Sequence, residues 1–338
     1  MITVYQIHPD SLVVVSSPTA GCWINVLEAT QEDAAQLEAW GFPSNYVTYA
    51  LDPGERARVE HSHGVTLIVF LIPHAKPVPI DTPYVTLPLG ILITESNIVT
   101  ICRTRSHILR DIAAGKIPDM PTVHQRRFIL KLLLRISEQY LKYLRTIDEA
   151  VEQTEVRLHH SLQNREVLEL LKYQKCLVYF ITALRSNELM LKRLQKSALL
   201  THAEDEELLE DVLIEIRQAI ELTEISERIL GQMMGAFTSI ISNNLNVVMK
   251  FLAAATIIIS LPTLVASFFG MNVNLPAANH PLAFWFVIGL AGTLAIGIVL
   301  FFWRKHWLCT SASIDALAPT DTDRATASRC NVYKVNLR

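Results

Sequence analysis

The stretch FLAAATIIISLPTLVASFFGMNVNLPAANHPLAFWFVIGLAGTLAIGIVLFFW, residues 251–303, decides how this chain is built, because its 53 residues include no Asp, Glu, Lys or Arg. A hydrocarbon core about 30 Å thick requires roughly 20 apolar residues per helix. Two such segments fit, 248–269 and 282–303, joined by the turn GMNVNLPAANHP. The sequence therefore predicts a transmembrane hairpin. The alternative is a buried core hairpin of a large soluble protein.

Basic residues at the ends of the hairpin predict its orientation. Lys250 precedes the first span, Arg304 and Lys305 follow the second, and the connecting turn has no Lys or Arg. Positive residues stay on the cytoplasmic side of a membrane. We therefore expect a multi-pass protein of the cell membrane, with both termini cytoplasmic and the GMN turn outside.

Composition argues against several other classes of protein. The formal net charge is −3, without a large basic patch, so nucleic acid is not an expected partner. The N-terminus, MITVYQIHPD, does not resemble a signal peptide. Five cysteines without a C-x-x-C pair indicate reduced thiols rather than a disulfide framework or a zinc site. The chain has no phosphate-binding G-x-x-x-x-G-K-[ST] motif, and its HSH (61–63) and HH (159–160) clusters lack acidic or cysteine partners at ligand spacing, so we expect no enzyme.

The composition and the residue pattern of the chain change along its length. Residues 1–118 predict a cytoplasmic α/β domain, with strands at 11–17, 46–51, 65–73 and 89–103 (the last a hairpin turning at 95–97) and a helix at 32–41. Residues 119–245 predict a cytoplasmic stalk of long helices. The third of these begins near Ala203 and, if it continues to Phe269, is about 100 Å long. We assign the hairpin to 246–308 and a disordered tail to 309–338.

A polar stripe follows the first membrane span. Between residues 246 and 269 there are five Asn, Ser and Thr residues, and each lies at one of seven positions that follow a heptad spacing. Chance would place all five at these positions in fewer than about one case in a hundred. Stepping backward in the same register again gives small or polar residues. The stripe consists of Asn246, Met249, Ala253, Thr256, Ser260, Thr263 and Ser267, continued backward by Ser242, Ser239, Gly235 and Gln232.

Ordinary helix packing is one explanation of this stripe, because small and hydroxyl residues mediate contacts between membrane helices. The other explanation is a narrow wet lumen surrounded by several copies of the helix. One chain cannot form that lumen from two spans, so it would have to be a homo-oligomer. The second span carries a single hydroxyl, Thr293, as expected of a helix that faces lipid.

The stripe leads to Gly270 and Asn272, where a ring of carboxamides would present neutral oxygen atoms. Mg²⁺ sheds water reluctantly and prefers octahedral oxygen ligands. Amide oxygens can bind its hydration shell, whereas a carboxylate ring would hold the ion more tightly and slow its passage. The glycine itself suggests a turn that requires a backbone conformation favoured by glycine.

This combination resembles the CorA family of magnesium and cobalt transporters over most of the chain. The resemblance rests on GMN (270–272) between two spans near a basic C-terminal end. It also rests on NVVMK (246–250), which is similar to the family's pore entrance, and on ALDPGERARVE (50–60). It implies a homopentamer with a funnel-shaped cytoplasmic α/β domain and a very long first transmembrane helix. It also implies passive transport of Mg²⁺, and of Co²⁺ or Ni²⁺, gated by cytosolic Mg²⁺, without an organic cofactor.

The resemblance also implies roles for individual residues. Gly270, Met271 and Asn272 would form the selectivity mouth. Asp211 in the acidic run 204–215 would bind regulatory Mg²⁺, with Asp81 as its partner. Together with the stripe, the resemblance gives these pore-lining residues: Asn246, Met249, Leu252, Thr256, Ser260 and Thr263.

Two features depart from the family pattern, and two other functions remain open. The turn after the motif has no acidic residue, and the tail extends beyond Leu308, where members typically end. A transporter of Zn²⁺ or another divalent ion would share the motif. A membrane-anchored helical signalling or scaffold protein, built as a dimeric rod, is the alternative from a different class, but it would need neither a polar stripe nor a hydrophilic mouth.

Overall fold

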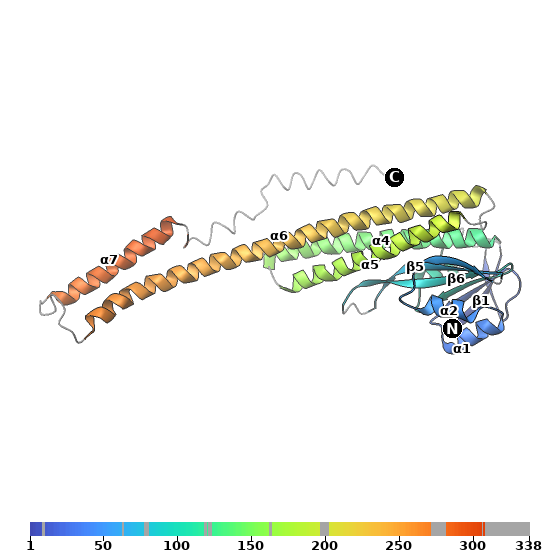
Figure 1. Cartoon of the computed structure of the whole chain (residues 1–338), viewed down its shortest axis with the longest axis horizontal. Coiled ribbons are helices and arrows are strands. Elements are labelled where there is room, and N and C mark those ends of the chain that lie inside the picture. Colours follow the sequence, from blue (N-terminus) through green and yellow to red (C-terminus); the bar gives the residue numbers. More distant parts are fainter. Residues whose placement is uncertain are drawn as a thin grey trace. The chain divides into compact units, whose positions relative to one another are not determined.

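A computed structural model describes residues 1–8, 11–62, 64–77, 81–117, 120, 124–161, 164–196, 203–271, 282–305 and 307. The chain forms two compact units, Met1–Gly235 and Ala236–Arg338, called here the N-terminal and C-terminal units. Figure 1 shows a sheet with helices on both faces in the N-terminal unit, and the helix pair of the C-terminal unit. The predicted fold class, an α/β domain followed by long helices and two apolar C-terminal helices, is confirmed.

The N-terminal unit is built on one seven-stranded sheet in the order β2-β1-β3-β7-β6-β5-β4. Only β3 and β7 are parallel, and the other neighbours are antiparallel. The predicted hairpin of β6 and β7 is present, with the Thr94 amide donating to the carbonyl of Asn97 at 3.0 Å. The strands are β1 (Ile2–Ile7), β2 (Leu12–Val15), β3 (Cys22–Leu27), β4 (Arg58–Ser62), β5 (Val65–Ala75), β6 (Tyr84–Ile93) and β7 (Ile98–Cys102).

Two short helices, α1 (Gln31–Ala39) and α2 (Ser44–Leu51), cover one face of this sheet. Their buried side chains pack on alternate residues of the strands, including Ile24 and Val26 of β3. The close approach of α2 depends on Gly90, because a Cβ added there would lie 2.3 Å from the Cβ of Ala50. A short helix α3 (His107–Ala113) follows β7.

The prediction of a strand at residues 46–51 is therefore wrong, because this segment forms most of α2. Its Tyr, Val and Thr residues favour strands, but intrinsic propensity yields to packing. Tyr46, Val47 and Ala50 are buried at helical spacing against the sheet. A strand would point alternate residues away from this core and leave half of them exposed.

Two long helices, α4 (Gln125–Ser161) and α5 (Asn164–Gln195), pack on the other face. The side-chain amide of Asn187 connects α5 to β5. It accepts a hydrogen bond from the Leu71 N–H at 2.9 Å and donates one to the Leu71 carbonyl at 2.8 Å. The Tyr140 hydroxyl of α4 donates to the same carbonyl at 2.9 Å. Strand β4 pairs with β5 only as far as Val69, so a buried side chain satisfies the backbone where the edge strand does not reach.

The helix α6 (Ala203–Phe269) is continuous over 67 residues, as the uninterrupted sequence predicted. Most of its buried residues in the N-terminal unit recur with a period of 3.5, which is typical of coiled-coil packing; they are Asp205, Leu209, Val212, Ile216, Ala219, Thr223 and Leu230, and Leu213 is buried beside them. Pro262 lies within the helix and, lacking an N–H, leaves the carbonyl of Ile258 without its usual intrahelical donor.

The C-terminal unit contains the last part of α6 and the helix α7 (Ala283–Arg304). Both helices are long and apolar enough to cross a membrane. In the described part of this unit only Phe237, Ala254 and Phe302 are buried. Large apolar side chains such as Trp285 and Phe286 are exposed, which fits a hairpin surrounded by lipid or by other copies. The predicted tail at 309–338 lies outside the described residues, and the expected domain boundaries stay predictions.

Candidate functional site: the polar stripe and the acidic residues

The polar stripe lies along one helix, as predicted. All seven positions from Asn246 to Ser267 belong to α6, and all seven side chains are exposed within the single chain. Leu252, the pore-lining residue that lies off the stripe, is exposed as well. One α6 helix and one α7 helix cannot enclose a lumen, so the exposed stripe is available to further copies or to another partner.

Three of the four hydroxyl groups between Asn246 and Ser267 donate their protons to carbonyls of the same helix. Thr256 donates to the Leu252 carbonyl at 2.8 Å, Ser260 to the Thr256 carbonyl at 2.7 Å, and Thr263 to the Ile259 carbonyl at 2.9 Å. This back-bonding leaves only oxygen lone pairs directed outward. A surface of acceptors suits a cation or the hydrogen atoms of its hydration water, and it does not suit an anion.

The first two residues of the GMN motif lie at the C-terminal end of α6. The Gly270 N–H donates to the Ala266 carbonyl at 2.9 Å, and the Met271 side chain is exposed. The expectation that Gly270 needs a conformation favoured by glycine is wrong, because the described glycines with positive φ are Gly21, Gly41, Gly64 and Gly115. A larger residue at position 270 is instead restricted by close contact, because an added Cβ would lie 3.3 Å from the Ala266 carbonyl oxygen. Asn272 lies outside the described residues.

The two predicted regulatory carboxylates have different surroundings. Asp81, which precedes β6, contacts Lys175 of α5 at 2.9 Å, and the hydrogen bond and charge of this lysine lower the pKa of the Asp81 carboxyl. Asp211 is exposed on α6. Within one chain the Asp81 carboxylate therefore contacts an ammonium group rather than Asp211. Among the described residues no group of three or more His, Cys, Asp or Glu side chains could hold a metal ion.

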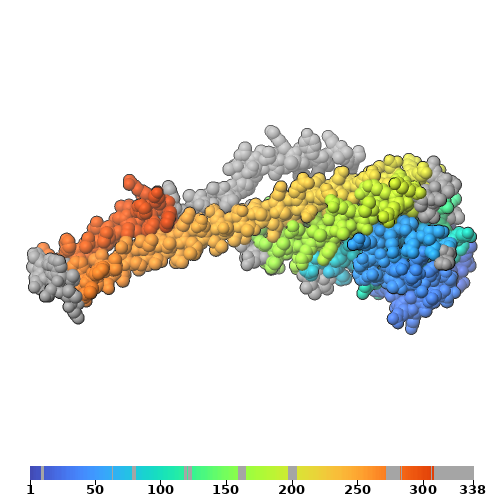
Figure 2. Space-filling model, viewed as in Figure 1, coloured from blue at the N-terminus to red at the C-terminus, as the bar shows by residue number. Residues whose placement is uncertain are grey.

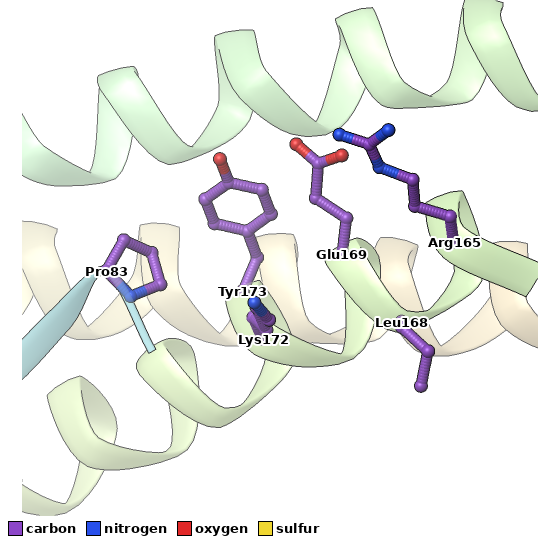
Figure 3. Close-up of a pocket in the computed structure, with 6 residues that line it drawn as sticks. All are labelled: Pro83, Arg165, Leu168, Glu169, Lys172 and Tyr173. Atoms are coloured by element: carbon purple, nitrogen blue, oxygen red, sulfur yellow. The ribbon is translucent and has the colours of Figure 1, made fainter. Parts of the chain in front are cut away.

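A cavity of about 550 Å³ lies near Asp81, at the N-terminal end of α5. Figure 3 shows its lining, with five side chains from α5 on one side and Pro83 on the other. The Glu169 carboxylate in this lining accepts a hydrogen bond from Arg157 of α4 at 2.9 Å. The cavity therefore lies beside the hydrogen bond between Arg157 of α4 and Glu169 of α5. Its lining residues are Pro83, Arg165, Leu168, Glu169, Lys172 and Tyr173.

Sequence reasoning missed Lys175 and Pro262. Lys175 is 94 residues from Asp81 along the chain, so only the packing of α5 beside the β5–β6 connection brings them together. Pro262 could have been found from the sequence alone, since it lies in the middle of the predicted first span.

Comparisons with known proteins agree with this architecture. A family model described as CorA-like Mg²⁺ transporter protein matches residues 19–305. The cobalt/magnesium transport protein CorA of Methanocaldococcus jannaschii is 27% identical over 299 residues, which cover 85% of this chain and 91% of that protein.

Solved structures show the same fold. The complete structure of the CorA magnesium transporter from Methanocaldococcus jannaschii superposes with a TM-score of 0.78 at 24% identity, covering 91% of this chain and 98% of that one. The full-length CmaX protein gives a TM-score of 0.64 at 17% identity, with 90% and 97% covered. The cytoplasmic domain of ZntB from Vibrio parahaemolyticus gives 0.56 at 12% identity, with 72% and 97% covered. At these identities the structural likeness concerns the fold.

Proposed function

The chain belongs to the CorA-like Mg²⁺ transporter family, and we propose that it conducts Mg²⁺ passively across a cell membrane through a pore formed by several copies of itself. Because this family consists of transporters, the expectation that the chain is not an enzyme is confirmed. The oligomeric pore, its gating and its driving force are proposals, and each rests on particular residues.

The single observation that carries this proposal is the stripe on α6, in which the hydroxyl protons of Thr256, Ser260 and Thr263 are bonded back into the helix. Three hydroxyls in succession offer only acceptors on the exposed side. Several α6 helices arranged around an axis would present rings of such oxygens to hydrated cations. We propose five copies, as the family resemblance implies, with α7 toward lipid. Asn246, Met249, Leu252, Thr256, Ser260 and Thr263 would line the pore, the apolar ones as a gate.

Selectivity would arise at the outer end of this pore. We assign the mouth to Gly270, Met271 and Asn272, where a ring of carboxamide oxygens would bind the hydration shell of Mg²⁺ rather than the bare ion. The tight contact of a Gly270 Cβ with the backbone supports a need for glycine at this position. The neutral ring would bind the ion weakly enough to release it.

The membrane potential would supply the driving force. Two charges that cross 100 mV gain about 4.6 kcal/mol. A potential that is negative inside would drive the divalent cation inward. The basic residues Lys250, Arg304 and Lys305 favour cytoplasmic termini. Regulation by cytosolic Mg²⁺ would use Asp211 and Asp81 from neighbouring copies. Lys175 would then have to give up its contact with Asp81 when the ion binds.

Co²⁺ is a second candidate ion, because the relative from Methanocaldococcus jannaschii is named for cobalt as well as magnesium. Ni²⁺ and Zn²⁺ would meet the same neutral oxygen ligands, for which transition metals show less preference than for imidazole or thiolate.

Metal uptake into proteoliposomes tests the proposal. The purified chain is reconstituted, an inside-negative potential is imposed, and influx of Mg²⁺, Co²⁺, Ni²⁺ and Zn²⁺ is followed with a trapped dye. We expect Mg²⁺ influx that increases with the potential, in protein whose mass in detergent corresponds to five copies. Protein-free liposomes are the control. A dimer without metal influx would instead favour the rod-shaped scaffold.

A further inference from the structure

The cavity at the N-terminal end of α5 has more positive than negative charge in its lining. Among the described residues of this lining, the only acidic group is the carboxylate of Glu169, which already accepts a hydrogen bond from Arg157 of α4 at 2.9 Å. Figure 3 shows the guanidinium group of Arg165 beside the same carboxylate, so two guanidinium groups surround one negative charge. Lys172 lies two turns further along α5, and within the described part of the chain it has no partner in a hydrogen bond or an ion pair. The cavity therefore has an excess of positive charge, although the formal net charge of the chain is −3.

The surroundings of Asp81, next to this cavity, show the same imbalance. Asp81 lies two residues before the lining residue Pro83 and contacts Lys175 at 2.9 Å. The hydrogen bond and charge of Lys175, followed by the charges of Lys76 and Lys172, lower the pKa of the Asp81 carboxyl. Three ammonium groups thus act on one carboxylate. Such a concentration of one sign of charge around a concave surface attracts an ion of the opposite sign, here an anion.

The cavity also has the size and the apolar surface of a site for a small organic ligand. Such sites usually enclose about 300–1,000 Å³, and this one measures about 550 Å³. Pro83, Leu168 and the ring of Tyr173 supply apolar surface. Burial, followed by the charge of Glu169, raises the pKa of Tyr173, so its hydroxyl keeps its proton at neutral pH and is able to donate a hydrogen bond. The lining therefore suits a ligand that has both an anionic part and a flat apolar part.

We propose that this cavity binds a nucleoside polyphosphate, with its phosphates between Arg165 and Lys172 and its base against Tyr173 and Pro83. A guanidinium group binds phosphate through two parallel hydrogen bonds, and an ammonium group binds it as a point charge. An aromatic ring offers a flat face on which any base is able to stack. Inorganic phosphate would leave the apolar part of the lining uncovered. The site goes beyond ion transport and does not depend on several copies, because all of its lining residues belong to one chain.

Equilibrium dialysis of the full-length chain in detergent against radiolabelled ATP tests this proposal. Mg²⁺ is removed with EDTA, so that the regulatory metal site of the proposed function does not contribute. We expect saturable binding. Unlabelled ATP should displace the label at a concentration about tenfold or more below that of inorganic phosphate, because it adds further charged hydrogen bonds and stacking. Adenosine, which has no phosphate, should not displace it.

Charge reversal at the lining residues identifies the site. Arg165→Glu and Lys172→Glu should each lower the affinity for ATP by about tenfold or more, because each removes a charged hydrogen bond and repels the phosphates. Arg193→Glu is the matched control, since Arg193 is exposed in the last turn of the same helix, about 30 Å from Lys172 at 1.5 Å per residue. All three variants should keep the melting temperature of the unmodified chain. If a reversed charge lowers it, Arg165→Gln and Lys172→Gln replace the Glu variants.

Three results would overturn the proposal. They are the absence of saturable ATP binding by the folded chain, an equal loss of affinity in Arg193→Glu and Lys172→Glu, and displacement by inorganic phosphate as effective as by ATP. Labelled phosphatidylglycerol is a separate arm, because a lipid headgroup also carries phosphate. If the chain binds this lipid and not ATP, and Lys172→Glu abolishes the binding, the ligand is a lipid and the nucleotide is wrong. The pore proposal stands or falls separately, on Mg²⁺ influx into proteoliposomes.

Discussion

At the scale of single residues, the polar side chains of this protein have two different roles. Some are buried and complete the backbone hydrogen bonding of the fold, as Asn187 does for Leu71. Others are uncharged and exposed, so a mutation there should change function rather than stability. The distinction matters because a buried polar group left without a partner costs about 1–3 kcal/mol, whereas most surface substitutions cost less than about 0.5 kcal/mol.

Asn272→Ala should nearly abolish Mg²⁺ uptake while leaving the oligomer assembled. The substitution would remove a carboxamide from every copy and thus a whole ring of ligands to hydrated Mg²⁺, with little effect on folding. Uptake is compared in vesicles matched for oligomer content, with Asn274→Ala, two residues further on, as control. Normal flux through Asn272→Ala would contradict the assignment of this residue as the ion-recognising ring.

Asn187→Leu should destabilise the N-terminal unit by about 1–3 kcal/mol, because the Leu71 N–H loses its acceptor, the amide of the buried Asn187. The Leu71 carbonyl keeps the hydroxyl of Tyr140 as donor. Thermal unfolding of the full chain in detergent measures the loss. Thr182→Val, which removes an exposed hydroxyl from the same helix, is the control and should change the melting temperature little. Equal melting temperatures for the two variants would show that Asn187 does not stabilise the junction.

His74 should make stability depend on pH. Burial, followed by the positive charges of His107 and Lys76, lowers the pKa of His74 below its ordinary value of 6.5. Between that lowered pKa and 6.5 the unfolded chain binds more protons than the folded chain, so stability is lost as the pH falls through this window. The melting temperature should decrease from pH 7 downward, and less so in His74→Gln. An identical pH profile for this variant would assign the effect to other groups.

At the scale of elements, α6 combines a coiled-coil surface in the N-terminal unit with a polar stripe in the C-terminal unit. Both surfaces follow the same 3.5-residue period, so one continuous helix can serve a packed stalk and a pore. Pro262 interrupts its hydrogen bonding within the apolar segment. The second apolar helix, α7, has one hydroxyl, and this group also donates into its own helix, from Thr293 to the Gly289 carbonyl at 2.7 Å.

Removing the hydroxyls of the stripe should reduce Mg²⁺ influx more than removing the one on α7. The variant Thr256→Val/Ser260→Ala takes away two rings of oxygen acceptors and keeps the shape of the helix nearly unchanged. We expect influx to fall by about tenfold, equivalent to about 1.4 kcal/mol. Thr293→Val is the matched control, since it removes the same chemistry from the other span. Equal influx in both variants would favour ordinary helix packing as the reason for the stripe.

At the scale of the whole molecule, regulation should depend on contacts between copies. If Asp211 binds regulatory Mg²⁺ as proposed, Asp211→Lys removes a carboxylate ligand and supplies a permanent cation, so the N-terminal unit should lose its dependence on Mg²⁺ while conduction persists. Protease protection is measured against Mg²⁺ concentration, with Glu206→Lys, exposed on the same helix, as control. Protection that still increases with Mg²⁺ in Asp211→Lys, as in the unmodified chain, would count against a sensor at this residue.

Those parts of this protein that depend on local periodicity can be predicted from the amino-acid sequence. A run of 53 residues without Asp, Glu, Lys or Arg gave the two apolar helices, and the absence of a break after Ala203 gave the length of α6. The stripe was visible because helical spacing alone determines which residues share a side. The hairpin of β6 and β7 followed from two β-rich runs around a polar turn.

Features that depend on residues far apart in the chain become apparent only in the folded structure. Residues 46–51 form a helix because the sheet, with Gly90 opposite Ala50, buries one side of α2, and this outweighs their preference for strands. Lys175 meets Asp81, and Asn187 meets Leu71, because α5 packs beside the sheet after more than 90 intervening residues. Local propensity carries no information about such contacts, since burial and hydrogen bonding between distant segments are decided only when the segments pack together.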